Sequence, residues 1–175
     1  MNLTPEQELD PQRFSVGGHA GLGWLTNAGS GAGQSSLDFG LILAFGLGQG
    51  GFHEPWSAEA FANFALTYST IVGTQTNPNR LTEFGGRVVY RAPSGPLMHS
   101  WLSLGAGIAF SSYGLPNGQH GDLTPGALID VGVGVHEWLL RRARTGFALR
   151  APLQLSSHPG VALFGVFYAL IGTGH

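Results

Sequence analysis

The sequence is short of charge and contains neither cysteine nor lysine. Charged residues make up 10% of its 175 residues, 8 basic and 10 acidic, whereas an ordinary soluble domain carries about 25%. The missing cysteine excludes disulfides, thiolate metal ligands and cysteine nucleophiles. A net charge of −2 without a basic stripe argues against nucleic-acid binding. So few charges do not cover the surface of a soluble domain, and this indicates that water is not the only solvent of the chain.

Long apolar runs are also absent. A membrane helix needs roughly 18 or more consecutive apolar residues. The most apolar stretch, residues 160–172, is shorter and is interrupted by Gly165. Helical periodicity is nearly absent along the whole sequence. Together these absences favour a β-rich protein with an apolar exterior.

The chain is rich in glycine and in period-two alternation. It contains 29 Gly, and apolar and small or polar residues alternate in eight segments separated by Gly, Pro, Asn and Ser. Segments of this length are long enough to cross a bilayer, which takes about 9–11 tilted residues. The predicted strands are 13–25, 36–48, 57–72, 82–91, 100–112, 125–138, 145–157 and 160–173.

The alternation separates large apolar residues from small and polar ones. In strand 36–48, Leu37, Leu41 and Phe45 belong to one face, and Asp38 and Ala44 to the other. An eight-stranded barrel encloses room for side chains only, so a large face on every strand would overfill it. We therefore expect the small and polar face inside the barrel and the large apolar face outside, against lipid.

The charges of the strands test this assignment, because they nearly all share the inward parity. On the outward parity only Glu137 is charged, at a strand end, and an Arg facing lipid at the midplane would cost about 2–4 kcal/mol. We predict that the inward charges form a paired polar plug, with a gated pore or proton path as the alternative. The predicted cluster is Asp38, Glu59, Glu83, Arg87, Arg91, Asp130 and Arg150.

Aromatic residues gather near the predicted strand ends, as the two membrane interfaces select. Trp101 and Trp138 have inward parity, so each is expected at a bulge or a turn. Arg141, Arg142 and Arg144 are expected to form a basic turn near lipid headgroups or cell-wall polymer. The predicted interfacial aromatics are Trp24, Trp56, Tyr68, Tyr90, Trp101, Tyr113 and Trp138.

These features predict an all-β fold, an eight-stranded antiparallel up-and-down transmembrane β-barrel. Eight alternating strands, glycine-rich inner faces and an interior charge cluster that includes Glu83, Arg87 and Arg150 resemble the small outer-membrane barrels of the outer-membrane protein A membrane domain and outer-membrane protein X type. The resemblance covers residues 13–173. In that family the last strand usually ends on an aromatic residue, and this chain departs from the pattern because it ends in residues 170–175, LIGTGH.

The resemblance implies a Gram-negative outer-membrane location and a structural or surface-interaction role without enzymatic activity. The expected partners are the lipid bilayer and, through the loops, lipopolysaccharide or another surface molecule. Residues 1–12 are expected to be a polar tail, since they lack the basic and apolar regions of a signal peptide, and residues 13–175 a single barrel domain.

Two other functions remain open at this point. A lipid-modifying barrel enzyme resembling lipid A deacylases would need Ser and His on one strand face, but His99 and Ser100 are adjacent and therefore have opposite parity. The second open function is that of a soluble lipocalin-like ligand-binding barrel. None of the seven His stands at HExxH spacing, so we expect no metal, no cofactor and no catalytic residues.

Overall fold

The computed structural model of the chain describes residues 14–27, 33–47, 55–67, 80–92, 98–112, 123–140, 143–156 and 160–172. These residues form eight strands. Their bounds are β1 Phe14–Asn27, β2 Gly33–Gly46, β3 Trp56–Thr67, β4 Arg80–Ala92, β5 Met98–Ser112, β6 Thr124–Leu140, β7 Ala143–Leu155 and β8 Gly160–Gly172.

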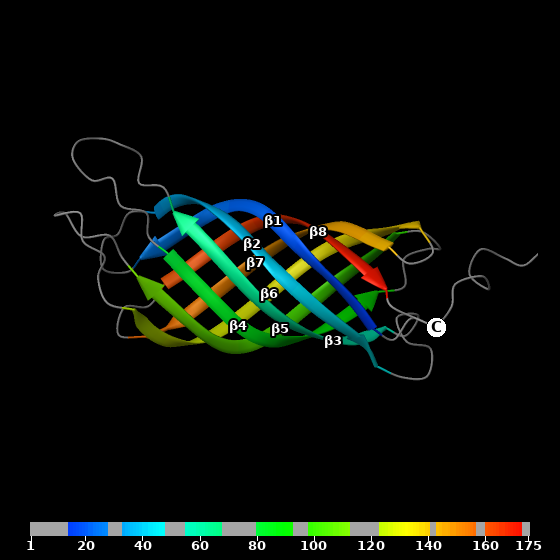
Figure 1. Cartoon of the computed structure of the whole chain (residues 1–175), viewed down its shortest axis with the longest axis horizontal. Helices are drawn as coiled ribbons and strands as arrows, with labels where there is room; N and C mark the ends of the chain where they lie inside the picture. The colour runs from blue at the N-terminus through cyan, green and yellow to red at the C-terminus, as the bar shows by residue number, and fades with distance from the viewer. Residues whose placement is uncertain are drawn as a thin grey trace, which may run out of the picture.

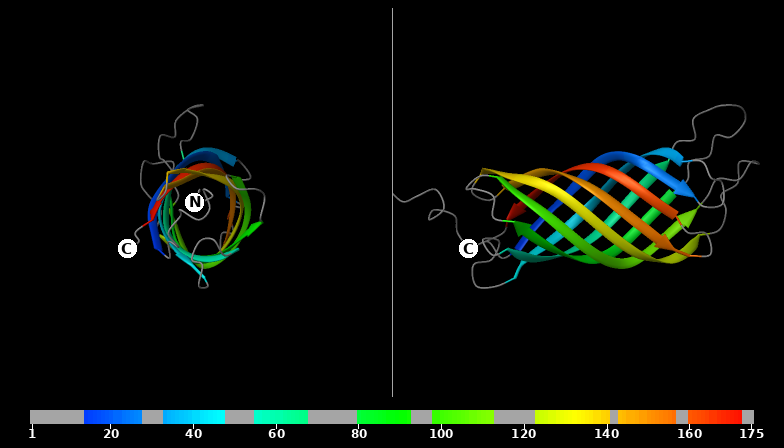
Figure 2. Two further views of the ribbon diagram at one scale, coloured as in Figure 1. Left: turned by 90° about the vertical axis from the view of Figure 1, so that its right-hand side faces the viewer. Right: turned by 180° about the vertical axis from the view of Figure 1, so that it is seen from behind.

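The strands form one closed antiparallel barrel in which each strand pairs with its neighbour in the sequence (Figure 1). Closure comes from β1 pairing with β8, from Ser15 opposite Gly172 to Asn27 opposite Gly160. The view along the barrel shows a continuous ring, and the side views show strands strongly tilted to the long axis (Figure 2). The predicted fold class is confirmed.

The strand boundaries differ from the predicted ones mainly where a turn is tighter than expected. β6 extends to Leu140, which pairs with Ala143 of β7, so residues 141–142 alone connect the two strands. Arg144 therefore belongs to β7 rather than to a basic turn. Residues 1–13, 28–32 and 68–79 lie outside the described residues, so the polar tail at 1–12 and the end of the third strand at Val72 stay predictions.

The outer face of the barrel is apolar on every strand. Leu22, Leu41, Leu104 and Phe167 are each about two-thirds exposed or more, at 64–71% of their surface. Because exposed leucine and phenylalanine on this scale are unfavourable in water, the faces predicted from the alternation are confirmed and the outer face is suited to lipid. No helix of sufficient length and apolar character to span a membrane occurs among the residues that the structure describes.

The interior is more apolar than the alternation predicted. Phe61, Leu128, Phe164 and Leu170 are all buried inside, beside the charged residues. Strand β8 contributes more buried apolar residues than any other strand described, since its residues are large on both faces and alternate between buried and exposed. The lumen is thus filled by polar and apolar side chains together.

Three of the seven predicted interfacial aromatics lie on the outer face. Trp24, Trp56 and Tyr90 are exposed, and the Trp56 and Tyr90 rings pack with centroids 4.8 Å apart. Tyr68 and Tyr113 lie outside the described residues. β6 has a register shift between Trp138 and Leu140, which is the irregularity expected at Trp138, although the side chain of Trp138 is not among those described.

Candidate functional site

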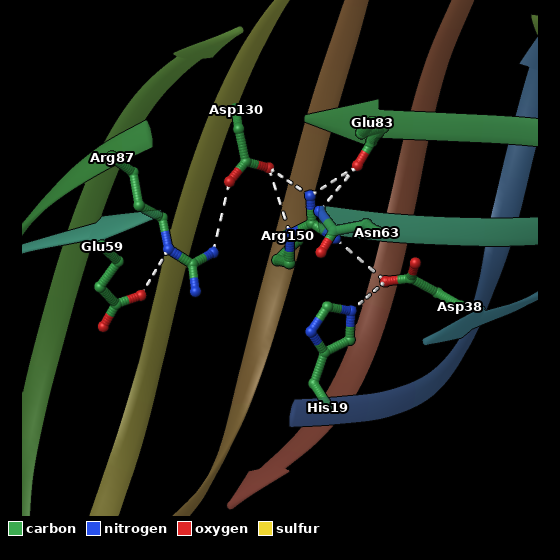
Figure 3. A network of polar contacts seen from close by, with 8 residues as sticks. All are labelled: His19, Asp38, Glu59, Asn63, Glu83, Arg87, Asp130 and Arg150. Atoms are coloured by element: carbon green, nitrogen blue, oxygen red, sulfur yellow. Dashed lines mark hydrogen bonds and ion pairs between the residues drawn. The ribbon is translucent and has the colours of Figure 1, made fainter. Parts of the chain in front are cut away.

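Arg150 is the centre of a buried polar network in the lumen (Figure 3). Its guanidinium donates to three carboxylates that come from three other strands. Nη1 donates to Asp38 Oδ2 at 3.1 Å, Nη2 donates to Glu83 Oε2 at 2.9 Å and to Asp130 Oδ1 at 3.0 Å, and Nε donates to Asp130 Oδ1 at 3.2 Å. One cation therefore joins β2, β4, β6 and β7 across the barrel.

Arg87 makes a second bridge inside the lumen. Its Nε donates to Glu59 Oε2 at 2.7 Å and its Nη1 to Asp130 Oδ2 at 3.4 Å. Asp130 thus connects the two arginines. The Phe61 ring lies between them, with both guanidinium carbons 5.7 Å from its centroid, a distance at which cation–π attraction adds to the ion pairs.

His19 extends the network to β1, and Asn63 adds a second contact from β3. His19 Nε2 lies 3.1 Å from Asp38 Oδ2, and Asn63 Nδ2 donates to Glu83 Oε2 at 3.0 Å. All of these side chains are buried. Taking such charges out of water is costly, and only pairing of this kind offsets the desolvation. The network therefore joins six strands of the barrel, and removing Arg150 leaves buried carboxylates with fewer counter-charges.

Arg91 and Arg144 lie nearer the end where β1 begins and β8 ends. Arg91 Nη2 donates to Ser57 Oγ at 2.9 Å, and Arg144 Nη2 donates to Ser15 Oγ at 3.4 Å. Arg144 is 3% exposed, so its assignment to a basic turn is wrong. On β7, Arg144 has the same parity as Arg150, which faces inward. This parity predicts a buried Arg144 once the turn is known to contain residues 141–142 only.

Trp101 also points into the lumen, so its assignment to the membrane interface is wrong. Its Nε1 donates to Tyr168 Oη at 3.0 Å, and Tyr168 Oη donates to the Val135 carbonyl at 3.3 Å. The structure shows no bulge at Trp101. The indole fits because glycine faces it. A Cβ on Gly134 would lie 2.6 Å from Trp101 Cζ2.

This packing makes a testable prediction for Gly134. Replacement by alanine should lower the free energy of unfolding by about 1–3 kcal/mol, the range for overpacking, and should shift the tryptophan fluorescence. Urea unfolding of the detergent-folded protein measures both effects. Gly86→Ala is the control, because a Cβ there would meet its nearest described atom at 3.5 Å, and the change should stay within about 0.5 kcal/mol. Equal effects of the two variants would contradict the assigned position of Trp101.

The structure places all seven residues of the predicted cluster inside the barrel. Six have contacts with each other: Asp38, Glu59, Glu83, Arg87, Asp130 and Arg150. The seventh, Arg91, donates to Ser57 Oγ. The predicted cluster did not include five further residues that the structure places in the polar lumen: His19, Asn63, Arg144, Trp101 and Tyr168.

The histidines and acids of the described part of the chain do not gather into a metal site. No group of three or more His, Asp or Glu residues there is arranged to hold a metal ion. His19 is the one histidine whose side chain is described, and its contact is the inward Asp38. His99 and His136 are register partners, and their side chains lie outside those described.

Similarity to known proteins is found in structure and not in sequence. No protein-family model matches the chain, and no curated protein matches it either. The crystal structure of Neisserial surface protein A, NspA, superposes with a TM-score of 0.75 at 10% identity, covering 91% of this chain and 97% of that one.

Two further solved structures share the fold. Ail, the attachment invasion locus protein of Yersinia pestis, has a TM-score of 0.55 at 13% identity, over 90% of this chain and 98% of that one. Ail has also been solved in complex with the heparin analogue sucrose octasulfate. The N-terminal β-barrel domain of Pseudomonas aeruginosa OprF has a TM-score of 0.51 at 14% identity, over 90% and 98% of the two chains.

The closed ring of eight strands, the apolar exterior and these likenesses define the class of protein. The chain has the fold of the small bacterial outer-membrane β-barrels, with lipid-facing side chains outside and a salt-bridge network inside. The expected resemblance to the small outer-membrane barrels is confirmed at the level of the fold.

Proposed function

We propose that the protein is a closed-lumen outer-membrane barrel with a structural and surface-interaction role, rather than a pore or an enzyme. The observation that carries this proposal is the network centred on Arg150. Arg150 is 1% exposed and Asp130 is 0% exposed, and together with Arg87 they link carboxylates from opposite sides of the barrel. Eight-stranded barrels hold only enough space for such side chains, so no continuous water path is expected.

Conductance in a planar lipid bilayer tests the closed lumen. The folded protein should give no stable unitary steps, because the ion pairs occupy the lumen. The double variant Glu59→Ala/Arg87→Ala removes a pair of opposite charges without changing the net charge, and it should raise the frequency of current steps. A stable unitary conductance of the unaltered protein would show that the barrel is a pore.

The surface-interaction role rests on the connections at the end opposite to the chain termini. These connections, residues 28–32, 68–79, 113–122 and 157–159, include the two longest in the chain, and in outer-membrane barrels the longer loops are extracellular. They contain no arginine and one acid, Asp122, but many Asn, Gln, Ser, Thr and Tyr. This composition supports a partner bound through uncharged polar groups, such as the sugar hydroxyls of lipopolysaccharide or another surface polysaccharide.

The loop composition predicts a difference from Ail, which has been solved with a sulfated ligand. Immobilised barrel should bind lipopolysaccharide carrying its full sugar chain and should not bind sucrose octasulfate, since polyanions are recognised mainly by arginine and lysine. A variant with residues 113–122 replaced by a Gly-Ser segment of equal length is the control and should bind the sugar chain less. Binding of sucrose octasulfate, or equal sugar binding by the variant, would contradict the proposal.

A further inference from the structure

A groove interrupts the apolar outer face of the barrel over β4, β5, β6 and β7. Its volume is about 490 Å³, which lies within the usual range of pockets that hold small molecules. Tyr90, Leu102, Val135, Phe147 and Leu149 contribute to its walls, and the side chains of all five are exposed. The groove is therefore open to the surroundings of the barrel and is separate from the polar lumen.

The groove arises where small residues stand beside large ones on the same face. Ala92 of β4 is the register partner of Ser100 of β5. Ser100 is opposite Val135 of β6, and Val135 is opposite Phe147 of β7. This row therefore passes from two small side chains to two large ones. The low side leaves space for another molecule, and an apolar wall without atoms against it forfeits dispersion contacts.

The groove extends from the membrane interface toward the middle of the bilayer. At one end, Ala92 is the last residue of β4, and the exposed ring of Tyr90 packs against the exposed ring of Trp56 with centroids 4.8 Å apart. Exposed aromatic residues of this kind mark the headgroup level in outer-membrane barrels. At the other end, Leu149 is the central residue of β7. The groove thus has the direction of a lipid acyl chain.

We propose that this groove is a binding site for one acyl chain of a phospholipid in the periplasmic leaflet. The groove is continuous with the lipid-facing surface, and its end of the barrel lies opposite the long connections, which are extracellular in such barrels. A flexible chain follows a narrow groove and gains packing contacts, the attraction that operates within a bilayer, whereas the convex face of a second barrel leaves it unfilled. The site goes beyond the closed-lumen function, and each can fail alone, because conductance tests the lumen and lipid binding tests the groove.

Fluorescence quenching by a phospholipid with brominated acyl chains tests the site in detergent micelles. Replacement of the other three tryptophans by phenylalanine leaves Trp101, which contributes to the groove wall although its indole points into the lumen. Quenching should saturate at a low mole fraction of the lipid in the micelle, and excess unbrominated phospholipid should reverse it. Quenching that stays proportional to the mole fraction would show random mixing around the barrel and would overturn the proposal.

Two alanine-to-phenylalanine variants separate the groove from the rest of the lipid face. Ala92→Phe fills the groove at its interfacial end and should weaken lipid binding by at least about fivefold, which corresponds to the smallest usual cost of overpacking. Ala106→Phe is the matched control, because Ala106 is an exposed residue of β5 away from the groove wall, and it should leave binding unchanged. Equal binding by the two variants would overturn the proposal.

Two measurements on the unaltered protein complete the test. Crystals grown with the brominated phospholipid should show anomalous scattering peaks of bromine in the groove, between Leu102 and Leu149, and a groove that holds only detergent in these crystals would overturn the proposal. Light scattering after size exclusion should show a monomer in detergent. A dimer that Ala92→Phe dissociates would show that a second copy of the chain covers the groove, and this too would overturn the proposal.

Discussion

Replacement of Arg150 by alanine is expected to lower the free energy of unfolding by about 3–5 kcal/mol, the cost of breaking a buried ion pair by removing one partner. Arg150 contacts Asp38, Glu83 and Asp130 at 2.9–3.2 Å. Without it, three buried carboxylates lose their shared counter-charge. For a chain of this length the loss corresponds to a fall in Tm of roughly 6–20 °C.

Heat-dependent mobility on gels and thermal unfolding in detergent measure this effect. Arg80→Ala is the matched control, because Arg80 is an exposed arginine at the start of β4, and its removal should change Tm by less than about 2 °C. Arg150→Lys keeps the charge but not the planar fork of donors, so its Tm should fall between the Tm of Arg150→Ala and that of Arg80→Ala. An Arg150→Ala protein as stable as the unaltered one would contradict the central position of Arg150.

Replacement of Leu41 by arginine is expected to cost about 2–4 kcal/mol of folding in a bilayer, the cost of an arginine on the lipid face at the midplane. Leu41 lies in the middle of β2 and is 67% exposed. Its register partner on β3, Ala62, is also central in its strand. In a soluble barrel the same substitution would place a charge in water and cost almost nothing.

The fraction folded in lipid vesicles during urea titration measures this cost. Leu47→Arg is the control for depth, since Leu47 is exposed just beyond the end of β2, and arginine near the interface costs about 0–1 kcal/mol. Equal small effects at positions 41 and 47 would favour the lipocalin-like alternative and contradict the membrane assignment.

Which faces would be inside could be predicted from the sequence because the side-chain period of a strand is two. Asp38, Glu83 and Arg150 share the inward parity with almost every other strand charge, and the structure buries all three. Parity alone does not determine which side chains meet, because the contacts depend on strand tilt and register. The Arg150–Asp38 hydrogen bond joins β7 to β2 across the lumen, and no local pattern in the sequence indicates it.

The errors at Trp101 and Arg144 have one physical origin. A large aromatic with inward parity was predicted at a bulge because a narrow lumen has no general space for an indole. The register, however, brings Gly134 and Gly132 beside it and leaves that space. Arg144 was assigned to a turn because the sequence does not show which residues pair and therefore how long the turn is. In the structure Leu140 pairs with Ala143, so the turn is short and Arg144 lies in β7.

The sequence by itself determined the number of strands, the orientation of their faces and the segregation of charge, since composition and period-two alternation are local properties of the chain. Only the tertiary structure decided which ion pairs form, that Arg144 lies buried beside Ser15, and how Trp101 fits the lumen. These features depend on register and closure, which bring together residues as far apart as Ser15 and Arg144. The 10% of charged residues is enough for this protein because water faces only a small part of its surface, and most of the strand charges are paired inside.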